Sequence, residues 1–138
     1  MQTEPTRGEK PPIILLDSEA DALADLAHAS LARSSLAARL LLEEIDRATT
    51  ASPADMPADV VTMRSQVEFV DEASGETHAV RLVYPHDADM EQHRLSVLTP
   101  VGAGLIGMRC GDAIEWPNRA GTFRRLRIVG VVQPERDQ

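Results

Sequence analysis

Residues 92–116 read QHRLSVLTPVGAGLIGMRCGDAIEW, and this stretch decides how the rest of the chain is arranged. Residues 95–100 alternate between two faces, as a half-buried strand does, until Pro100 removes a backbone donor. We expect residues 101–108 to form a short helix, because proline suits the first helical position. The Gly-Asp pair at 111–112 then favours a turn, after which the chain becomes extended again. The predicted unit is strand, short helix, turn and strand.

The same stretch contains the spacing GxGxxG at Gly102, Gly104 and Gly107, where a dinucleotide pyrophosphate could bind between a strand and a helix. A dinucleotide-binding fold also needs further strand–helix–strand units and an acidic residue about 20 positions later. The residue at that position is Arg127. We therefore interpret the three glycines as close-packing positions in a short helix that lies on a sheet, and we expect no cofactor.

Composition limits the possible classes of function. The 138 residues suit one small domain, and 43% of them are hydrophobic. The sequence has four aromatic residues, which are too scattered to suggest a ring-lined pocket: Phe69, Tyr84, Trp116 and Phe123. The single Cys110 has no partner for a disulfide or a metal, and we expect it to be a small buried side chain. With no secretion signal and no apolar stretch that could span a membrane, the sequence predicts a cytoplasmic protein. We also expect it to be a monomer.

Charge is distributed unevenly along the chain. The formal net charge is −8, which argues against direct, sequence-specific DNA binding because such binding neutralises phosphates. Residues 116–138 differ from the rest, with five arginines against two acidic residues. Four of these arginines, Arg119, Arg124, Arg125 and Arg127, indicate either a solvated strand face or a docking surface for an acidic protein.

Two helices are predicted in the N-terminal part of the chain, after a polar, proline-containing segment at residues 1–12 that we expect to be disordered. The first helix covers about 14 residues from a cap at Asp17 or Ser18, and the second covers residues 35–48. Because the link between them is short, residues 13–51 are expected to form an antiparallel helical hairpin. Ordinary core helices packed flat on a sheet are the alternative.

Charged side chains on the second helix suggest one local contact. Glu43 is placed to pair with Arg47 one helical turn later.

The remaining residues predict an antiparallel sheet. Alternation is clearest at residues 60–70, where one face is apolar and the other polar. Residues 77–84 form the partner strand after a turn that contains Gly75, and residues 122–132 form the last strand. The apolar face of the first strand comprises Val61, Met63, Val67 and Phe69, and its polar face comprises Thr62, Arg64, Gln66 and Glu68. With one short helix across these strands, the fold class is α+β.

The loop at residues 85–92 and the residue that follows it resemble a metal site in composition only. Their spacing matches no two-histidine helix motif, and acidic surface loops are common, so we expect no metal. The residues concerned are His86, Asp87, Asp89, Glu91 and His93.

Three segments, taken in order, resemble one bacterial family: MPADVVTMRSQVEF at residues 56–69, LVYP at 82–85 and LSVLTPVGAGLIGMRCGDAIEW at 95–116. They are similar to the regulators of nucleoside diphosphate kinase (Rnk), which are relatives of the transcript cleavage factors GreA and GreB. The resemblance covers nearly all of residues 13–135. It implies an N-terminal antiparallel coiled coil and, in residues 53–135, an FKBP-like domain of the GreA/GreB C-terminal type.

The resemblance also implies a partner, RNA polymerase. In this family the C-terminal domain binds the rim of the polymerase secondary channel, and the coiled coil enters the channel. The loop that grips polymerase in the cleavage factors reads Asp or Asn, then Ser, then Pro, and these positions fall on Leu98, Thr99 and Pro100. Thr99 and Pro100 keep the hydroxyl and the turn, whereas Leu98 replaces the polar residue. The tip of the predicted hairpin consists of Ala32, Arg33, Ser34 and Ser35.

Three classes of function follow from the resemblance. We favour a regulator without chemistry of its own, which competes with GreA/GreB-type factors, regulates elongation and, as the family name implies, affects nucleoside diphosphate kinase levels. A transcript cleavage factor must deliver carboxylates to the polymerase magnesium, and the nearest acids to the tip, Asp25 and Glu43, lie a turn or more back. An FKBP-like prolyl isomerase needs an aromatic pocket, and the fold alone does not imply that activity.

Overall fold

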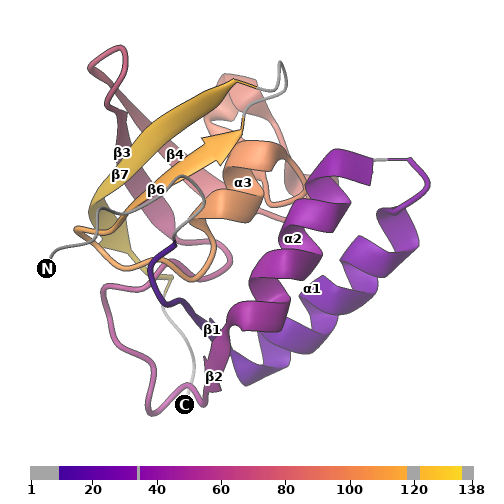
Figure 1. The fold of residues 1–138 in the computed structure, drawn as a ribbon. Coiled ribbons are helices and arrows are strands. Elements are labelled where there is room, and N and C mark those ends of the chain that lie inside the picture. Colours follow the sequence, from indigo (N-terminus) through magenta and orange to yellow (C-terminus); the bar gives the residue numbers. More distant parts are fainter. Residues whose placement is uncertain (1–9, 34, 118–121, 135–138) are drawn as a thin grey trace, which may run out of the picture.

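The computed structural model describes residues 10–33, 35–117 and 122–134. Helices α1 (Asp17–Ser30) and α2 (Ser35–Arg47) form an antiparallel hairpin, and the short helix α3 (Pro100–Leu105) lies between α2 and a curled sheet (Figure 1). The α+β class and the helical hairpin predicted from the sequence are confirmed.

Within the described residues, the main sheet has five strands in the order β5-β4-β3-β7-β6. Its neighbouring strands are antiparallel except β4 and β5, which run parallel. The prediction of an antiparallel sheet is wrong at this edge, because two short 3-10 turns carry the chain back before β5 begins. The strands are β3 (Gln66–Asp71), β4 (Glu76–Val83), β5 (Arg94–Ser96), β6 (Ala113–Pro117) and β7 (Phe123–Val132), and the turns are η1 (Pro85–Asp87) and η2 (Met90–Gln92).

The strand predicted for residues 60–70 is regular only in its second half. Val61 instead bonds to the segment after α3: its N–H donates to the Met108 carbonyl at 2.9 Å, and its carbonyl accepts from Gly107 N–H at 2.9 Å. Arg64 has a φ of 68°, in the left-handed region, so the chain turns just before β3. The inward positions of the alternation are buried as predicted.

Thr62 was predicted to point outward, but its exposed fraction is 1%. The turn brings its hydroxyl to 2.9 Å from the hydroxyl of buried Ser65, which also accepts from the Thr62 N–H at 2.9 Å. A polar side chain can be buried here because its hydrogen bonds are made inside the turn.

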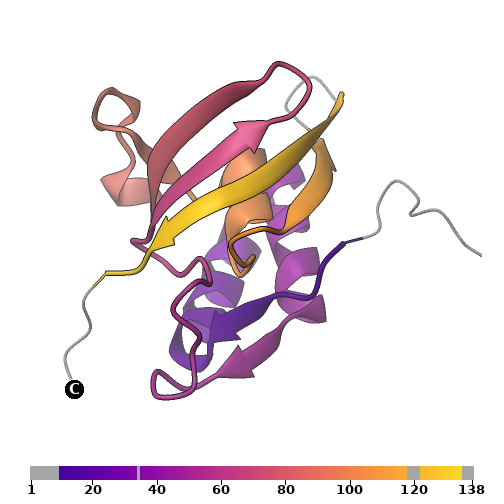
Figure 2. The ribbon, with the colours of Figure 1, turned by 90° about the vertical axis from the view of Figure 1, so that its left-hand side faces the viewer.

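A second, smaller sheet, which the sequence did not predict, ties the chain entering the hairpin to the chain leaving it. Strands β1 (Ile14–Leu16) and β2 (Thr49–Ala51) pair in parallel at the base of the helices (Figure 2). Lys10 and Pro11 were assigned to a disordered tail, yet both contact α2, as described below. Residues 1–9 of that predicted tail lie outside the described residues.

The ends and pairings of the helices differ from two local predictions. The residue that precedes α1 is Leu16, and neither Asp17 nor Ser18 caps the helix; the Asp17 carboxylate accepts instead from the adjacent Ser18 N–H at 2.7 Å. Arg47 pairs with the buried Glu44, three residues earlier, rather than with exposed Glu43. The buried carboxylate offers the guanidinium a less hydrated partner than the exposed one.

One hydrophobic core continues from the hairpin into the sheet. Leu23 and Ala27 of α1 and Leu41 of α2 belong to the same buried cluster as the inward residues of the strands. The predicted division of the chain into units 13–51 and 53–135 stays a prediction. Apolar contacts cross the boundary between the two units.

The three glycines of the GxGxxG spacing are close-packing positions, as predicted. A Cβ on Gly104 would lie 2.8 Å from the Trp116 ring, and one on Gly102 would overlap the Ser96 carbonyl oxygen. Gly107 has a φ of 84° and faces Ile13 of the N-terminal segment. Gly102 and Gly104 thus allow α3 to touch the loop and the sheet. The helix was predicted to reach residue 108 but ends at Leu105, so Gly107 lies beyond it and lets the chain after α3 approach the segment that precedes α1.

One further burial prediction is wrong. Cys110 is exposed, because it lies in the tight turn whose Arg109 and Asp112 close on each other. At the end of β7, Val132 is 68% exposed, where the strand runs past the end of its neighbour β6. No helix in the described part of the chain combines the length and the apolar character that crossing a membrane requires.

Candidate docking surface

The loop between β5 and α3 is held rigidly by its own side chains. The Ser96 hydroxyl accepts from Leu98 N–H at 2.9 Å, and the Thr99 hydroxyl donates to the Ser96 carbonyl at 2.8 Å. The same Thr99 hydroxyl accepts from Gly102 N–H at 3.1 Å, which makes Thr99 the N-cap of α3. The loop therefore presents one fixed conformation to a partner.

The three residues assigned to polymerase docking are unequally accessible. Leu98 and Thr99 are half-buried, and Pro100 is buried at the first position of α3. The Pro100 carbonyl accepts a hydrogen bond from the indole N–H of Trp116. Leu98 can contact a partner directly, whereas Thr99 and Pro100 set the shape of the loop.

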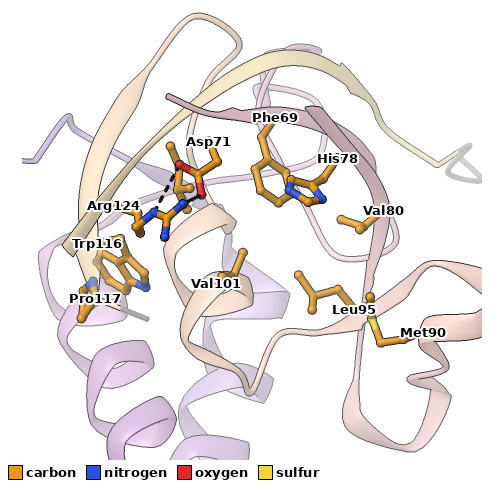
Figure 3. Close-up of a pocket in the computed structure, with 11 residues that line it drawn as sticks. Phe69, Asp71, His78, Val80, Met90, Leu95, Val101, Trp116, Pro117 and Arg124 are labelled. Carbon is orange, nitrogen blue, oxygen red and sulfur yellow. Dashed lines mark hydrogen bonds and ion pairs between the residues drawn. The ribbon is translucent and has the colours of Figure 1, made fainter. Parts of the chain in front are cut away.

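Beside this loop the concave face of the sheet holds an apolar pocket of about 260 Å³ (Figure 3). Trp116 and Val101 lie on one side, and Phe69, stacked on His78 at 5.2 Å between ring centroids, lies on the other. Leu95 and Met90, the latter 59% exposed, line the end toward β5. Leu95 and Val101, which flank the loop on either side along the chain, both line the pocket, so the pocket lies beside the loop.

This pocket was not predicted from the sequence. Phe69 and His78 meet because they are register partners across the β3–β4 hairpin, and Trp116 comes from β6, the edge strand two places from β3 in the sheet. The inference that the aromatic residues are too scattered to share a pocket is wrong. The hairpin register, read from the turn at Gly75, is the one sequence signal that could have placed Phe69 and His78 together.

The arginines of the last strand are largely neutralised. Arg124 Nη2 lies 2.8 Å from the Asp71 carboxylate at the edge of the pocket, and Arg125 and Arg127 both contact Glu72, at 3.0 and 2.6 Å. The hydrogen bond from Arg127, with the charges of both arginines, lowers the pKa of Glu72 below its ordinary value of 4.5. These pairs fit the solvated strand face better than a docking surface for an acidic protein. Arg119 lies outside the described residues.

The tip of the hairpin is only partly described. Ala32 and Arg33 are exposed after the end of α1, and α2 begins at Ser35. Ser34 lies outside the described residues. Within the described part of the chain, no group of three or more His, Cys, Asp or Glu side chains is arranged to hold a metal ion.

Comparisons with known proteins give the class to which this arrangement belongs. The family model described as the C-terminal part of the transcription elongation factors GreA/GreB matches residues 56–133. A solved structure, the prokaryotic transcription elongation factor GreA/GreB from Nitrosomonas europaea, aligns with 90% of this chain and all of its own, with 37% identity and a TM-score of 0.67. The chain belongs to the GreA/GreB family of transcription elongation factors.

Two individual relatives match this chain over most of its length. The regulator of nucleoside diphosphate kinase from Escherichia coli K12 is 39% identical over 127 residues, which cover 91% of this chain and 93% of that protein. The transcription elongation factor GreA from Acidiphilium cryptum is 32% identical over 131 residues, covering 89% and 83%. The family resemblance found in the sequence is confirmed, and the protein is a regulator of the transcription elongation factor type.

Proposed function

We propose that the protein binds RNA polymerase at the rim of the secondary channel, places its helical hairpin in the channel and regulates elongation without chemistry of its own. It does so as a monomer and competes there with GreA/GreB-type factors. A changed level of nucleoside diphosphate kinase, which the name of the Escherichia coli relative suggests, would follow from this action on transcription.

The observation that carries the proposal is the packing that links the loop to the hairpin. The loop ends in α3, and α3 packs against α2; Ala103 on α3 and Ala37 and Ala38 on α2 are buried. A partner that grips Leu98 and the pocket beside it therefore also holds the hairpin close to itself.

The chemistry of the hairpin argues against a cleavage factor. Residues 26–42 contain no acidic side chain, so the carboxylates nearest the tip are Asp25 and Glu43. Asp25 lies five residues before the end of α1, about 7.5 Å back along the helix axis. Carboxylates at that depth do not reach a metal that the tip approaches, which supports a role in occupying the channel.

A direct test is capture of core RNA polymerase by the parent protein and by Leu98→Asp. A carboxylate at this half-buried position should cost about 1 kcal/mol of folding stability, while it places an unpaired charge against the apolar docking contact. We expect binding to fall at least about tenfold, or about 1.4 kcal/mol. The matched control is Phe123→Asp, at the first residue of β7, where the side chain is 41% exposed and lies outside the loop between β5 and α3. Equal binding by parent and Leu98→Asp would refute the docking assignment.

The pocket supports one second candidate, a prolyl isomerase. Phe69 and Trp116 give it the aromatic walls that the sequence did not predict. A protease-coupled assay on short Xaa-Pro peptides decides the matter, with Val101→Glu, which fills the pocket with a charge, as the negative control. Catalysis by the parent that Val101→Glu abolishes would establish this second function; no catalysis above the uncatalysed rate would remove it.

A further inference from the structure

A fully buried glutamate holds together the N-terminal segment and the second helix of the hairpin. Glu44 is 0% exposed, and its two carboxylate oxygens are used by different cations. One oxygen accepts from Lys10 Nζ at 3.1 Å, and the other accepts from Arg47 Nη2 at 2.8 Å and Nε at 3.1 Å. Arg47 also donates through Nη1 to the Pro11 carbonyl at 2.5 Å. The N-terminal segment and α2 thus meet at one carboxylate.

This network continues to the docking loop. Lys10 Nζ lies 5.0 Å from the centre of the Trp116 ring, within the range of a cation–π interaction. The indole N–H of Trp116 donates to the Pro100 carbonyl at the first residue of α3. A connected path therefore runs from Glu44 on the hairpin, through Lys10 and Trp116, to the end of the loop at Pro100.

The packing between α2 and the rest of the domain leaves a role for such a network. Both α2 and α3 bury apolar residues, Ala37, Ala38 and Leu41 on α2 and Ala103 on α3. Apolar contact is not directional, so it favours closeness without fixing an angle. Hydrogen bonds between charged groups are directional, and buried ionic groups are best attested as setting register between packed elements.

We propose that Glu44 is a positioning residue that sets the direction of the hairpin relative to the docking loop, acting through Lys10 and Trp116. For the biological consequence this inference rests on the proposed binding to polymerase. Its structural part does not, because the direction of the hairpin is a property of the free protein. The role differs from a purely stabilising one, since it predicts a change of geometry in a variant that is still folded.

The first experiment measures that geometry in the absence of polymerase. One spin label is attached to the natural, exposed Cys110 and a second to Ala29→Cys, at an exposed position in the last turn of α1. Pulsed electron–electron double resonance then gives the distribution of distances between the label on the hairpin and the label at Cys110. In Glu44→Gln the shape and the hydrogen-bonding oxygen are kept but the charge is lost, so we expect a distribution about twice as wide or a shifted mean, with helix content unchanged.

The matched control is Glu43→Gln, the exposed neighbour on the same helix, which should leave the distribution unchanged. If Glu44→Gln does not fold, Lys10→Met serves instead, because it removes the link to Trp116 and leaves the Arg47 pair in place. A folded Glu44→Gln or Lys10→Met with the parent's distribution, even with a lower melting temperature, would overturn the proposal. So would an equal broadening in Glu43→Gln.

A second experiment connects the geometry to polymerase. A photo-crosslinking amino acid at Arg33 in the hairpin tip should attach the parent to one defined region of polymerase. Glu44→Gln should bind polymerase within about twofold of the parent but give weak or dispersed crosslinks. Unchanged crosslinks with unchanged binding would contradict the positioning role. If the parent itself does not bind polymerase, the proposed function fails, and the distance measurement still decides the role of Glu44.

Discussion

Replacing Gly102 by alanine tests whether the glycine spacing in α3 serves packing, because packing makes a numerical prediction. A Cβ at this position would overlap the Ser96 carbonyl oxygen and lie 2.9 Å from the Val97 Cα. Non-bonded atoms of these types are ordinarily more than about 3 Å apart, and the Ser96 oxygen is the closer obstacle, so the loop or the helix must move by about 1 Å or more. Both neighbours are backbone atoms of the loop, which no rotation of a side chain can remove.

The expected cost of Gly102→Ala lies near the top of the range for overpacking, about 3 kcal/mol, and the better helix propensity of alanine returns at most about 1 kcal/mol. The net loss is about 2 kcal/mol, which for a domain of this size lowers the melting temperature by about 8 °C. Fluorescence of the single Trp116 during urea and thermal unfolding measures it. Because the loop shifts, polymerase binding should fall as well.

Two other glycines complete the series. In Gly104→Ala the obstacle is the Trp116 ring at 2.8 Å, a side chain fixed by its bond to Pro100, so the loss should be about 1 kcal/mol. In Gly130→Ala the nearest atom is the Glu68 Oε1 at 3.3 Å, at the end of a flexible side chain, and stability should stay within about 0.5 kcal/mol of the parent. If Gly102→Ala is as stable as Gly130→Ala, the close-packing interpretation is refuted.

Three further outcomes are expected. Added to polymerase together with a cleavage factor, the protein should suppress RNA cleavage, and excess cleavage factor should restore cleavage fully. Inhibition that no excess of cleavage factor reverses would contradict a shared site. Stimulation of cleavage by the protein alone would make it a cleavage factor. The pKa of Glu72 is lowered from 4.5 on folding, so its pairs with Arg125 and Arg127 stabilise the fold above that pH and lose this effect as the pH falls through the folded pKa. The stability difference between the parent and Glu72→Gln, followed by urea unfolding, should therefore be constant above about pH 5 and shrink in acid, whereas a difference independent of pH would exclude this linkage. Exposed Cys110 should react completely with a thiol reagent in the native protein, and protection until unfolding would show that it is buried after all.

Features encoded by neighbouring residues could be predicted from the sequence. The start of α3 at Pro100, the turns at Gly75 and Gly111 and the helical hairpin follow from proline geometry, positive φ at glycine and apolar periodicity. Each depends on a few adjacent side chains and on backbone sterics that act in any context. The family resemblance could be recognised for a related reason, since its motifs are short, contiguous segments.

The features that the sequence did not reveal join residues far apart in the chain. The pocket needs Trp116 and Phe69 brought together by the order of strands, and the parallel edge strand β5 depends on where the preceding turns return the chain. Glu44 lies three residues after buried Leu41 on the inner side of α2, whereas its neighbour Glu43 is exposed, and only the fold brings Lys10, 34 positions away, to the Glu44 carboxylate. Local sequence determines which elements form, because propensity is local. Tertiary structure decides which side chains are desolvated and paired, because burial is a property of the assembled layers.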